Sequence, residues 1–504
     1  MGAAASREVD EEKRQVTQRM SRLCIQDKVY VEGDDTPNDA PPPYQVRDRA
    51  TTISLSQTKY WEEKLLSDPK SRLAISALSA NPIPSILTNH AVTVVDTQTF
   101  NIKIPFEGDP ITNQRSSGRC WLFASTNIFR VALMKKYSLK EFELSQAYLF
   151  YWDKIEKANW FLEHVIDTAE EDLDSRLIQE LFGKPVQDGG QWDMVANLVN
   201  KYGLVPQSLY PDSYNAKNSS KLVSLMTTKL REQALVLRDL ARSKSSRADV
   251  LLSEKKDKFL QEIHGILTIM LGPPPSPEKK FTWDFYDANG NFHRLSLSPL
   301  EFAMGLSSKD SLRACGGINV HELFSLVNDP RNPYERLLTV DRLGNISGGR
   351  SITYVNVDMD TIKSASISML KAGIPVFFGC DVGKFSDSGS GIMDLDLYDY
   401  TLGFNISLGM NKAQRLETGE SVMTHAMVLT AVHVEAGKPV RWRVQNSWGE
   451  NSGDKGYFIM TDKWMDEFVY QVVVDPRFVS QVVRDVLKQE AKVLPLWDPI
   501  GALA

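Results

Sequence analysis

Between residues 222 and 270, apolar side chains recur every three to four positions, which is the spacing of one face of an α-helix. Leu222, Met226 and Leu230 begin this repeat, and charged residues fill the other faces. A glycine and three prolines follow at positions 272–275, and proline cannot continue a helix. The pattern therefore predicts a long helical segment that ends there.

Other helices are indicated by the residues that begin them. Ser145 is a suitable N-cap, and Ser298 followed by Pro299 marks a second helix start. Apolar spacing also predicts helices over residues 57–66 and from Cys120 onward.

Shorter apolar or alternating runs predict strands, most of them in the last third of the chain. Asn289-Gly290 predicts the tight turn of a hairpin over residues 281–297. The other expected strands span residues 90–105, 374–380, 426–434, 440–445 and 457–460.

The composition narrows the class of protein. Of 504 residues, 42% are hydrophobic and 24% charged, and the formal net charge is −6. These values are typical of a globular protein with an extensive core and not of a disordered chain. The longest apolar runs are far shorter than the ~18 residues of a membrane-spanning helix, and no secretory signal opens the chain. The net charge gives no general attraction for nucleic acid.

The four cysteines, Cys24, Cys120, Cys315 and Cys380, are widely scattered. Their spacing matches neither a disulfide framework nor a zinc site. We therefore expect a cytoplasmic protein that needs no metal or other cofactor.

Residues 1–50 are rich in charge and proline and have too little apolar surface to fold alone, so we expect a disordered tail. Gly2 lies in a pattern that fits N-myristoylation, which would give a weak membrane contact. Residues 41–44, PPPY, fit a ligand for a WW domain, although a plain linker is the simpler interpretation.

The candidate nucleophile is Cys120. Gly118 permits a tight turn before it, and good helix formers follow, so Cys120 is expected at the start of a helix. The positive end of the helix dipole favours a thiolate, which is the competent nucleophile. Gln114 lies on the preceding loop, where its side-chain amide could join the Cys120 backbone N–H as an oxyanion hole.

Two segments of the last third supply partners for a thiol. His425 begins an apolar strand, and Asn446 follows the next strand. Adjacent antiparallel strands would bring both side chains together, with Asn446 orienting the imidazole that accepts the thiol proton. Trp448 would then shield the His–Asn hydrogen bond from water.

Taken together, these segments resemble the papain-type cysteine peptidases. The resemblance is closest to the bleomycin hydrolase family within that group, and it covers nearly all of the chain beyond the tail. The segments that carry it are residues 114–124, 143–150, 188–191, 337–345 and 497–504.

The resemblance implies a role for each matching residue. Cys120 corresponds to the nucleophile, His425 to the base, and Asn446 to the residue that orients the base. Gln114 corresponds to the oxyanion donor, and Gly189-Gly190 to the loop that lets a substrate backbone approach closely.

This chain departs from secreted papain-like enzymes in two ways. Ser117 stands where those enzymes often have a disulfide cysteine, which fits a reducing compartment. The interval between Cys120 and His425 is about twice the usual one, and the helical insertion accounts for the excess.

The expected fold class is therefore α+β, a papain-like two-lobed cysteine peptidase with a large helical insertion. Its expected parts are a tail (1–50), a helical lobe with the nucleophile (51–210), a mostly helical insertion for oligomerisation (211–330), a β-rich lobe with His425 and Asn446 (331–490) and a C-terminal arm (491–504).

The resemblance also implies how substrates are selected. The apolar, proline-stiffened arm would lie in the active-site cleft, and a carboxylate at Ala504 would attract a substrate's free α-amino group. The implied enzyme is a homohexameric aminopeptidase that acts on peptides and aminoacyl amides, including bleomycin and homocysteine thiolactone. Two alternatives stay open: an endopeptidase with an open cleft, and a DNA-binding assembly, which the net charge does not favour.

Overall fold

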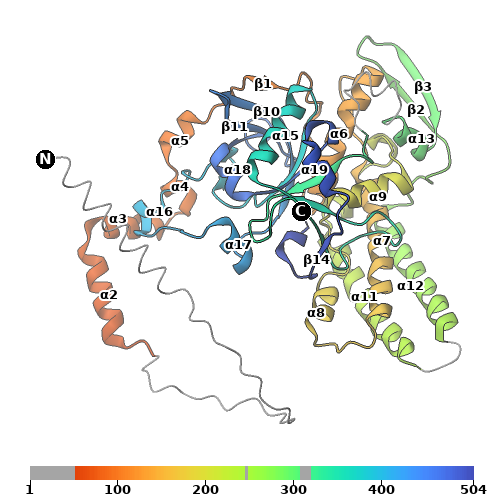
Figure 1. The fold of residues 1–504 in the computed structure, drawn as a ribbon, viewed down its shortest axis with the longest axis horizontal. Coiled ribbons are helices and arrows are strands. Elements are labelled where there is room, and N and C mark those ends of the chain that lie inside the picture. The colour runs from red at the N-terminus through yellow and green to blue at the C-terminus, as the bar shows by residue number, and fades with distance from the viewer. Residues whose placement is uncertain (1–51, 244–247, 307–318, 504) are drawn as a thin grey trace. The chain divides into compact units, whose positions relative to one another are not determined.

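The computed structural model describes residues 52–243, 248–306 and 319–503 (Figure 1). Several features predicted from the sequence lie outside these ranges, namely Gly2, Cys24, the segment 41–44, Cys315 and Ala504.

The chain divides into two compact units, Met1–Leu66 and Ser67–Ala504. In the first unit the described residues form most of helix α2 (Leu55–Ser67), which agrees with the predicted helix over residues 57–66. None of the residues of α2 is buried. The core and the candidate site therefore lie in the second unit.

One large sheet organises the second unit. In the described part of the chain its strands have the order β14-β5-β6-β4-β13-β7-β10-β11-β12-β9-β8, with β1 paired to β10. The strands are β1 (Ile102–Lys103), β4 (Phe324–Val327), β5 (Arg336–Val340), β6 (Tyr354–Asn356), β7 (Val376–Cys380), β8 (Ser386–Asp387), β9 (Ile392–Met393), β10 (His425–Glu435), β11 (Lys438–Gln445), β12 (Tyr457–Thr461), β13 (Val469–Val474) and β14 (Lys492–Leu494).

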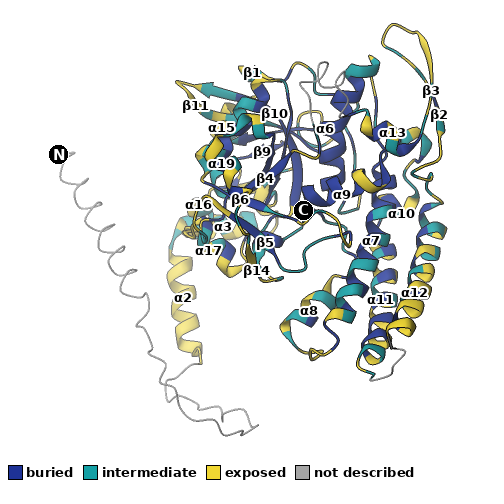
Figure 2. Ribbon diagram, turned by 45° about the vertical axis from the view of Figure 1, so that its right-hand side comes forward, coloured by how far each residue is buried: buried dark blue, intermediate teal, exposed yellow. Residues whose placement is uncertain are grey.

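The middle of this sheet is buried on both faces. Strands β7 and β13 are buried along their whole length. Figure 2 shows the same dark blue burial at β4 and β10, which flank these two strands in the sheet. Helix α15 (Met359–Lys371) packs against β7, β10 and β13, and helix α6 (Cys120–Tyr137) packs against β7 and β10. The predicted strands in β7, β10, β11 and β12 are confirmed. The apolar runs of β7, β10 and β12 match this double burial, whereas β11 is the alternating strand that its sequence predicts.

The predicted strand over residues 90–105 is wrong for most of its length. Residues His90–Val95 form helix α5, and the side chain of Asn89 caps it by accepting a hydrogen bond from the Ala91 N–H. No residue of α5 is buried, so its valines have no sheet partner that would reward an extended backbone. Only β1 is a strand in this range.

A layer of helices covers the Cys120 side of the molecule. Helix α6 packs against α7 (Gln146–Asp167) and α9 (Trp192–Tyr202). Ser145 caps α7 as predicted, because its hydroxyl accepts a hydrogen bond from the Tyr148 N–H. Residues 120–134 of α6 are all buried. A nucleophile at the first position of α6 is therefore held by a helix that is surrounded by packed neighbours.

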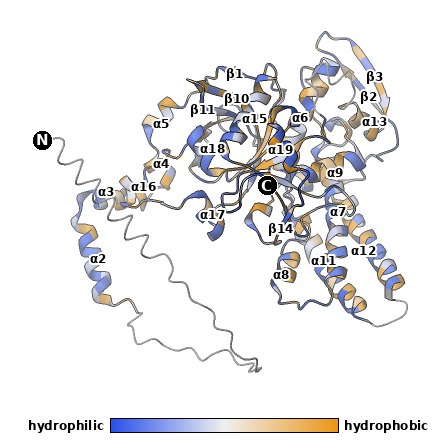
Figure 3. Ribbon diagram, viewed as in Figure 1, coloured by the Kyte–Doolittle hydropathy of each residue, from blue (hydrophilic) through white to orange (hydrophobic). Residues whose placement is uncertain are grey.

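The predicted helical insertion is formed by α11 (Ser220–Ala241) and α12 (Ala248–Leu271), which pack on each other and on α7 (Figure 1). Figure 3 shows apolar and polar positions alternating along both helices. Leu222, Met226 and Leu230 are fully buried, as their spacing predicts. The predicted boundary at residue 330 is too late, because β4 already belongs to the main sheet, between β6 and β13.

The hairpin and the helix start after α12 are also confirmed. Strands β2 (Phe281–Tyr286) and β3 (Phe292–Leu297) pair in antiparallel register, and Gly290 in their turn has a φ of 85°. Ser298 and Glu301 form a capping box at the start of α13 (Pro299–Met304).

The remaining helices are short connections around these layers. They are α3 (Pro69–Leu78), α4 (Ile83–Leu87), α8 (Arg176–Gly183), α10 (Tyr214–Lys217), α16 (Tyr400–Phe404), α17 (Lys412–Thr418), α18 (Asp462–Phe468) and α19 (Gln481–Val486), with 3-10 turns at η1 (Gln207–Leu209), η2 (Pro476–Phe478) and η3 (Pro499–Gly501). Within the described ranges, no helix is long and apolar enough to cross a membrane.

Candidate active site

Cys120 is the first residue of α6, as the sequence predicts. Its side chain is almost completely buried, and the backbone N–H groups of Ala426, Trp121 and Cys120 itself lower the pKa of its thiol. Ala426 directly follows His425 at the start of β10. The packing of α6 against β10 therefore brings the thiol to the strand end that carries the histidine.

Burial dominates the ionisation of both groups. It raises the pKa of the Cys120 thiol to about 11, even though backbone N–H groups favour the thiolate. It also lowers the pKa of His425 to about 4, because the imidazolium loses its hydration. The helix N-terminus favours the thiolate, as expected from the sequence, but burial opposes it more strongly. With these pKa values both side chains are uncharged at neutral pH.

His425 and Asn446 meet at one edge of neighbouring antiparallel strands. His425 begins β10, Asn446 directly follows β11, and the distance from Nε2 of His425 to Oδ1 of Asn446 is 2.9 Å. The Ser447 N–H donates to the same oxygen at 2.8 Å, which fixes the orientation of the Asn446 amide. Nε2 of His425 therefore carries the proton, and Nδ1 is left with a lone pair.

Trp448 lies against this pair, where the sequence places it. Its ring centroid is 4.8 Å from that of His425, and the planes are inclined by 33°. An aromatic ring over the imidazole keeps water from the His425–Asn446 hydrogen bond.

Gln114 is held from two sides. Its Nε2 donates to the Ser117 carbonyl at 2.8 Å, and its Oε1 accepts from the hydroxyl of Ser447 at 2.7 Å. The amide nitrogen has two N–H bonds, so one remains after the bond to Ser117. The loop before Cys120 thus presents a fixed amide donor beside the start of α6.

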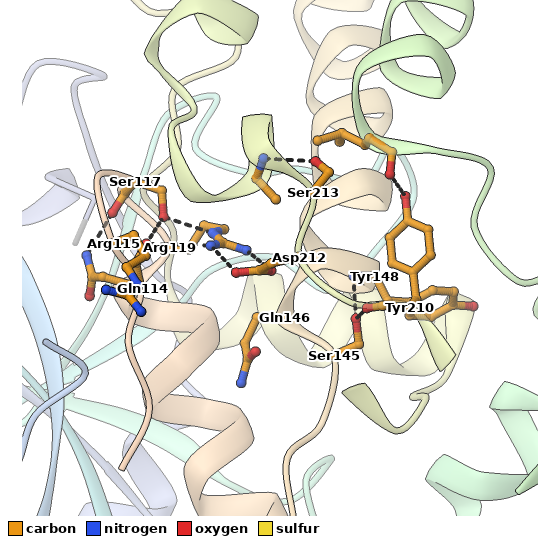
Figure 4. Close-up of polar contacts among 12 residues, drawn as sticks. Gln114, Arg115, Ser117, Arg119, Ser145, Gln146, Tyr148, Tyr210, Asp212 and Ser213 are labelled. Atoms are coloured by element: carbon orange, nitrogen blue, oxygen red, sulfur yellow. Dashed lines mark hydrogen bonds and ion pairs between the residues drawn. The ribbon is translucent and has the colours of Figure 1, made fainter. Parts of the chain in front are cut away.

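A residue that the sequence did not single out stabilises this loop. Arg119, directly before Cys120, is completely buried, and its guanidinium makes two parallel contacts of 2.8 and 2.9 Å with the carboxylate of Asp212 (Figure 4). Its Nε also donates to the Ser117 hydroxyl at 2.8 Å. A charged residue directly before an apolar helix was the available signal, but its partner is 93 positions away in the chain.

The predicted substrate loop at Gly189-Gly190 packs directly against the nucleophile helix. A Cβ at Gly190 would lie 2.4 Å from the ring of Trp121, so no side chain fits there. The Gly189 carbonyl accepts a hydrogen bond from Nζ of Lys157 at 2.6 Å. Glycine is therefore required at position 190 so that the loop can pack against Trp121. This requirement is separate from the predicted need for a substrate backbone to approach the loop closely.

A cavity of about 830 Å³ lies beside the start of β10. One wall includes Met423 and Thr424, which directly precede His425, and another includes Lys157 and Gln187. The end of the chain also lines it, through residues Pro495, Leu496, Trp497, Asp498, Pro499, Gly501, Ala502 and Leu503. The predicted C-terminal arm therefore reaches this cavity, whereas Ala504 itself lies outside the described residues.

The arm is attached at three further points. Nε2 of Gln191, the residue after Gly190, donates to the Ala502 carbonyl at 2.6 Å. Arg331 pairs with Asp498 at 2.7 Å. The guanidinium of Arg176 lies 4.4 Å from the ring centroid of Trp497. These contacts hold the arm beside the loop that contains Gly189-Gly190.

The site matches a known family. The sequence profile of the peptidase C1-like family covers residues 52–501. The chain belongs to the peptidase C1-like family. Mouse bleomycin hydrolase is 42% identical over 451 residues, which cover 88% of this chain and 96% of the mouse protein. Mitochondrial cysteine proteinase 1 of Saccharomyces cerevisiae is 40% identical over 467 residues, 90% of this chain and 94% of the yeast protein.

A solved structure agrees with this family assignment. The crystal structure of PepW from Lactobacillus rhamnosis superimposes with a TM-score of 0.85 at 41% sequence identity, and covers 90% of this chain and 100% of PepW. The peptidase C1-like family establishes the papain-like α+β fold and a cysteine peptidase that hydrolyses peptide bonds. Among the described residues, no group of three or more His, Cys, Asp or Glu side chains is arranged to hold a metal ion.

Proposed function

We propose that this chain is a cysteine aminopeptidase of the bleomycin hydrolase type, with Cys120, His425, Asn446 and Gln114 as its catalytic residues. The observation that carries the proposal is the packing of α6, which begins at Cys120, against β10, whose first residue His425 is hydrogen-bonded to Asn446. The two residues before His425 line a cavity that the C-terminal arm also lines.

The proposed reaction begins with the neutral pair. Nδ1 of His425 takes the proton of the Cys120 thiol while Sγ forms a bond to the carbonyl carbon of the substrate. Asn446 keeps the proton on Nε2 and stabilises the imidazolium that forms. The remaining N–H of Gln114 and the backbone N–H of Cys120 hold the oxyanion.

The tetrahedral intermediate then collapses to products. The C–N bond breaks as the imidazolium of His425 returns its proton to the leaving amine, and a thioester on Cys120 remains. Water attacks this thioester with His425 as the base, which releases the acid and the Cys120 thiol. Peptides and aminoacyl amides, including bleomycin, are the proposed substrates. Homocysteine thiolactone is a further proposed substrate, in which the C–S bond breaks and the leaving thiol takes the proton.

The arm is the proposed reason for exopeptidase specificity. It is held at Ala502 by Gln191, next to the predicted substrate loop, and Ala504 follows two positions later in the sequence. In this proposal a carboxylate at Ala504 pairs with the α-amino group of the substrate, and the arm occupies the space that residues before the scissile bond would need. Peptides with a blocked N-terminus are then excluded.

We also propose that the enzyme assembles as a homohexamer, as the sequence resemblance implies. Exposed apolar side chains on α11 and α12 support contacts between chains through the insertion, among them Leu225, Leu235, Val250 and Ile269. Sedimentation-equilibrium mass is the test, and a monomer at micromolar concentration contradicts this part of the proposal.

The decisive experiment compares free and N-blocked aminoacyl amides. We expect rapid hydrolysis of the free substrates, none of the blocked ones, and no activity in Cys120→Ala. Deleting Leu503-Ala504 should raise the hydrolysis of blocked peptides. Turnover by Cys120→Ala contradicts the nucleophile assignment, whereas rapid cleavage of blocked peptides by the intact protein supports an open-cleft endopeptidase.

A further inference from the structure

Asp188 joins the nucleophile loop to the substrate loop. It directly precedes Gly189, and its Oδ2 accepts a hydrogen bond from the Gly118 N–H at 3.0 Å. Its backbone carbonyl accepts from Nε1 of Trp121 at 2.8 Å. One residue of the substrate loop therefore contacts the backbone before Cys120 and the side chain after it.

Two other parts of the fold meet the same carboxylate. Nζ of Lys154, a fully buried side chain of α7, lies 2.8 Å from Oδ1. The hydroxyl of Ser219, at the start of α11, donates to Oδ2. Asp188 thus collects contacts from the nucleophile loop, the helical layer and the insertion.

The cations around Asp188 also fix the backbone of its own loop. Nζ of Lys154 donates to the carbonyls of Val186 and Gln187 at 2.7 and 2.8 Å. Nζ of Lys157 donates to the carbonyls of Gln187 and Gly189 at 3.1 and 2.6 Å. The two lysines therefore hold the carbonyls of Val186, Gln187 and Gly189 through four hydrogen bonds.

The carboxylate remains charged throughout the working range of pH. Burial opposes its ionisation, but Lys154, Ser219 and the Gly118 N–H outweigh burial and hold the pKa of Asp188 at about 2. This permanent negative charge is close enough to Cys120 to act against the thiolate, and so contributes to the raised pKa of that thiol.

The nucleophile loop and the substrate loop are packed too closely to move relative to each other. A Cβ at Gly118 would lie 2.8 Å from Cβ of Asp188, and one at Gly190 would lie 2.4 Å from the ring of Trp121. The two loops therefore fit in one relative position. A shift of either loop moves the thiol relative to a substrate held at Gly189-Gly190.

We propose that Asp188 is a positioning residue that fixes the nucleophile loop against the substrate-binding loop through one buried carboxylate. The inference rests on the proposed role of Cys120 as nucleophile. The hydrogen bonds and the ion pair of this carboxylate connect the two loops without a disulfide, so reducing agents leave the connection intact.

The test uses Asp188→Asn and Ser219→Ala in the full chain, with Ser224→Ala as the control. Asn keeps an oxygen acceptor but removes the charge, and Ser219→Ala removes one donor to the same oxygen without changing any charge. Ser224 is exposed on the same helix as Ser219. Two quantities are measured: kcat and KM on a free aminoacyl amide, and the pH midpoint of Cys120 alkylation, with the site identified by peptide mass spectrometry.

Asp188→Asn should lower kcat/KM by about tenfold to a hundredfold, since small displacements of a reacting group cost this much. It should also shift the alkylation midpoint of Cys120 to lower pH. Ser219→Ala should lower kcat/KM severalfold and leave the midpoint in place, and Ser224→Ala should match the wild type. Wild-type kcat/KM and midpoint in Asp188→Asn overturn the proposal.

If Asp188→Asn does not fold because Lys154 loses its counter-charge, Asp188→Asn/Lys154→Met removes both buried charges together. A folded double variant with at least tenfold lower kcat/KM supports the proposal, and one with wild-type kcat/KM overturns it. Alkylation of Cys120 needs no peptide turnover, so it reports on Asp188 even if the proposed activity proves wrong.

Discussion

The hydroxyl of Ser447 donates a hydrogen bond of 2.7 Å to Oε1 of Gln114. This bond joins the residue after Asn446 to the proposed oxyanion donor, so the two halves of the site share one hydrogen-bond network. The backbone N–H of Gln114 also donates to the Ser447 carbonyl at 2.8 Å. The direction of the Gln114 amide is thus set by the same segment that orients His425.

Ser447→Ala should reduce kcat about tenfold and leave KM nearly unchanged, because it frees the Gln114 amide without removing a group that binds the ground state. Gln114→Ala should cost about a hundredfold or more in kcat, the magnitude typical of a lost oxyanion donor. Steady-state kinetics on an aminoacyl amide checks both. Ser452→Ala, whose hydroxyl bonds to the Ser388 carbonyl outside the site, is the control and should behave as wild type.

The buried neutral His425 makes stability depend on pH. Its pKa is about 4 in the folded protein and 6.5 as the ordinary value, so between these values the unfolded chain binds more protons than the folded one. Folding stability contributed by His425 is therefore complete above pH 6.5 and is lost as pH falls toward 4, with a total on the order of 3 kcal/mol.

Denaturant unfolding of the wild type and His425→Gln at pH 7.5 and pH 5 measures this effect. The free energy of unfolding should fall less on acidification in the variant, because glutamine does not titrate. An equal fall in both proteins would mean that other groups cause the acid sensitivity.

Weakening the attachment of the arm should admit blocked substrates. Gln191→Glu replaces the N–H donor to the Ala502 carbonyl by an acceptor, and Asp498→Asn removes the charge that pairs with Arg331. Each variant should raise the ratio of N-blocked to free peptide hydrolysis severalfold, while Cys120 alkylation stays at the wild-type rate. The matched control is Asp485→Asn, which removes an exposed carboxylate that pairs with Lys488 on the surface. An unchanged ratio in both arm variants contradicts the proposed role of the arm.

Gly190→Ala should destabilise the protein by about 1–3 kcal/mol, because its Cβ would overlap the buried ring of Trp121. Gly265→Ala is the matched control: position 265 lies within α12, and nothing lies within 4 Å of an added Cβ. That substitution should be neutral or stabilise by up to about 1 kcal/mol through helix propensity. Unfolding midpoints in urea distinguish the two, and equal midpoints would show that the loop moves away from Trp121 at little cost.

The helices and strands with strong apolar periodicity were predictable, because their pattern reflects burial that the structure also has. The start of α7 at Ser145 and the hairpin turn at Gly290 followed from local chemistry that needs no distant partner. The predicted strand at residues 90–95 was wrong because strand formation depends on a distant partner. Their valines are compatible with a strand, but no neighbouring strand pairs with them, and sequence alone does not reveal the missing partner.

In the candidate site, too, features set by local sequence were predictable and those that depend on distant partners were not. Cys120, His425, Asn446 and Gln114 were predicted from their motifs, and the structure places them around one helix end and one strand edge. Arg119 and Asp188 were missed, because their roles depend on partners in other parts of the chain. The sequence indicated that the helix start favours the thiolate, but it did not show that burial raises the pKa of Cys120, because burial is a property of the packed site.

The attachment of the last strand has a practical consequence for anyone producing this protein. β14 pairs in parallel with β5, and the segment after it runs directly into the cavity beside Thr424. A purification tag attached after Leu503, which lines the cavity, would begin beside it and compete with anything that binds there. Recombinant versions intended for activity measurements should therefore carry their tag at the other end.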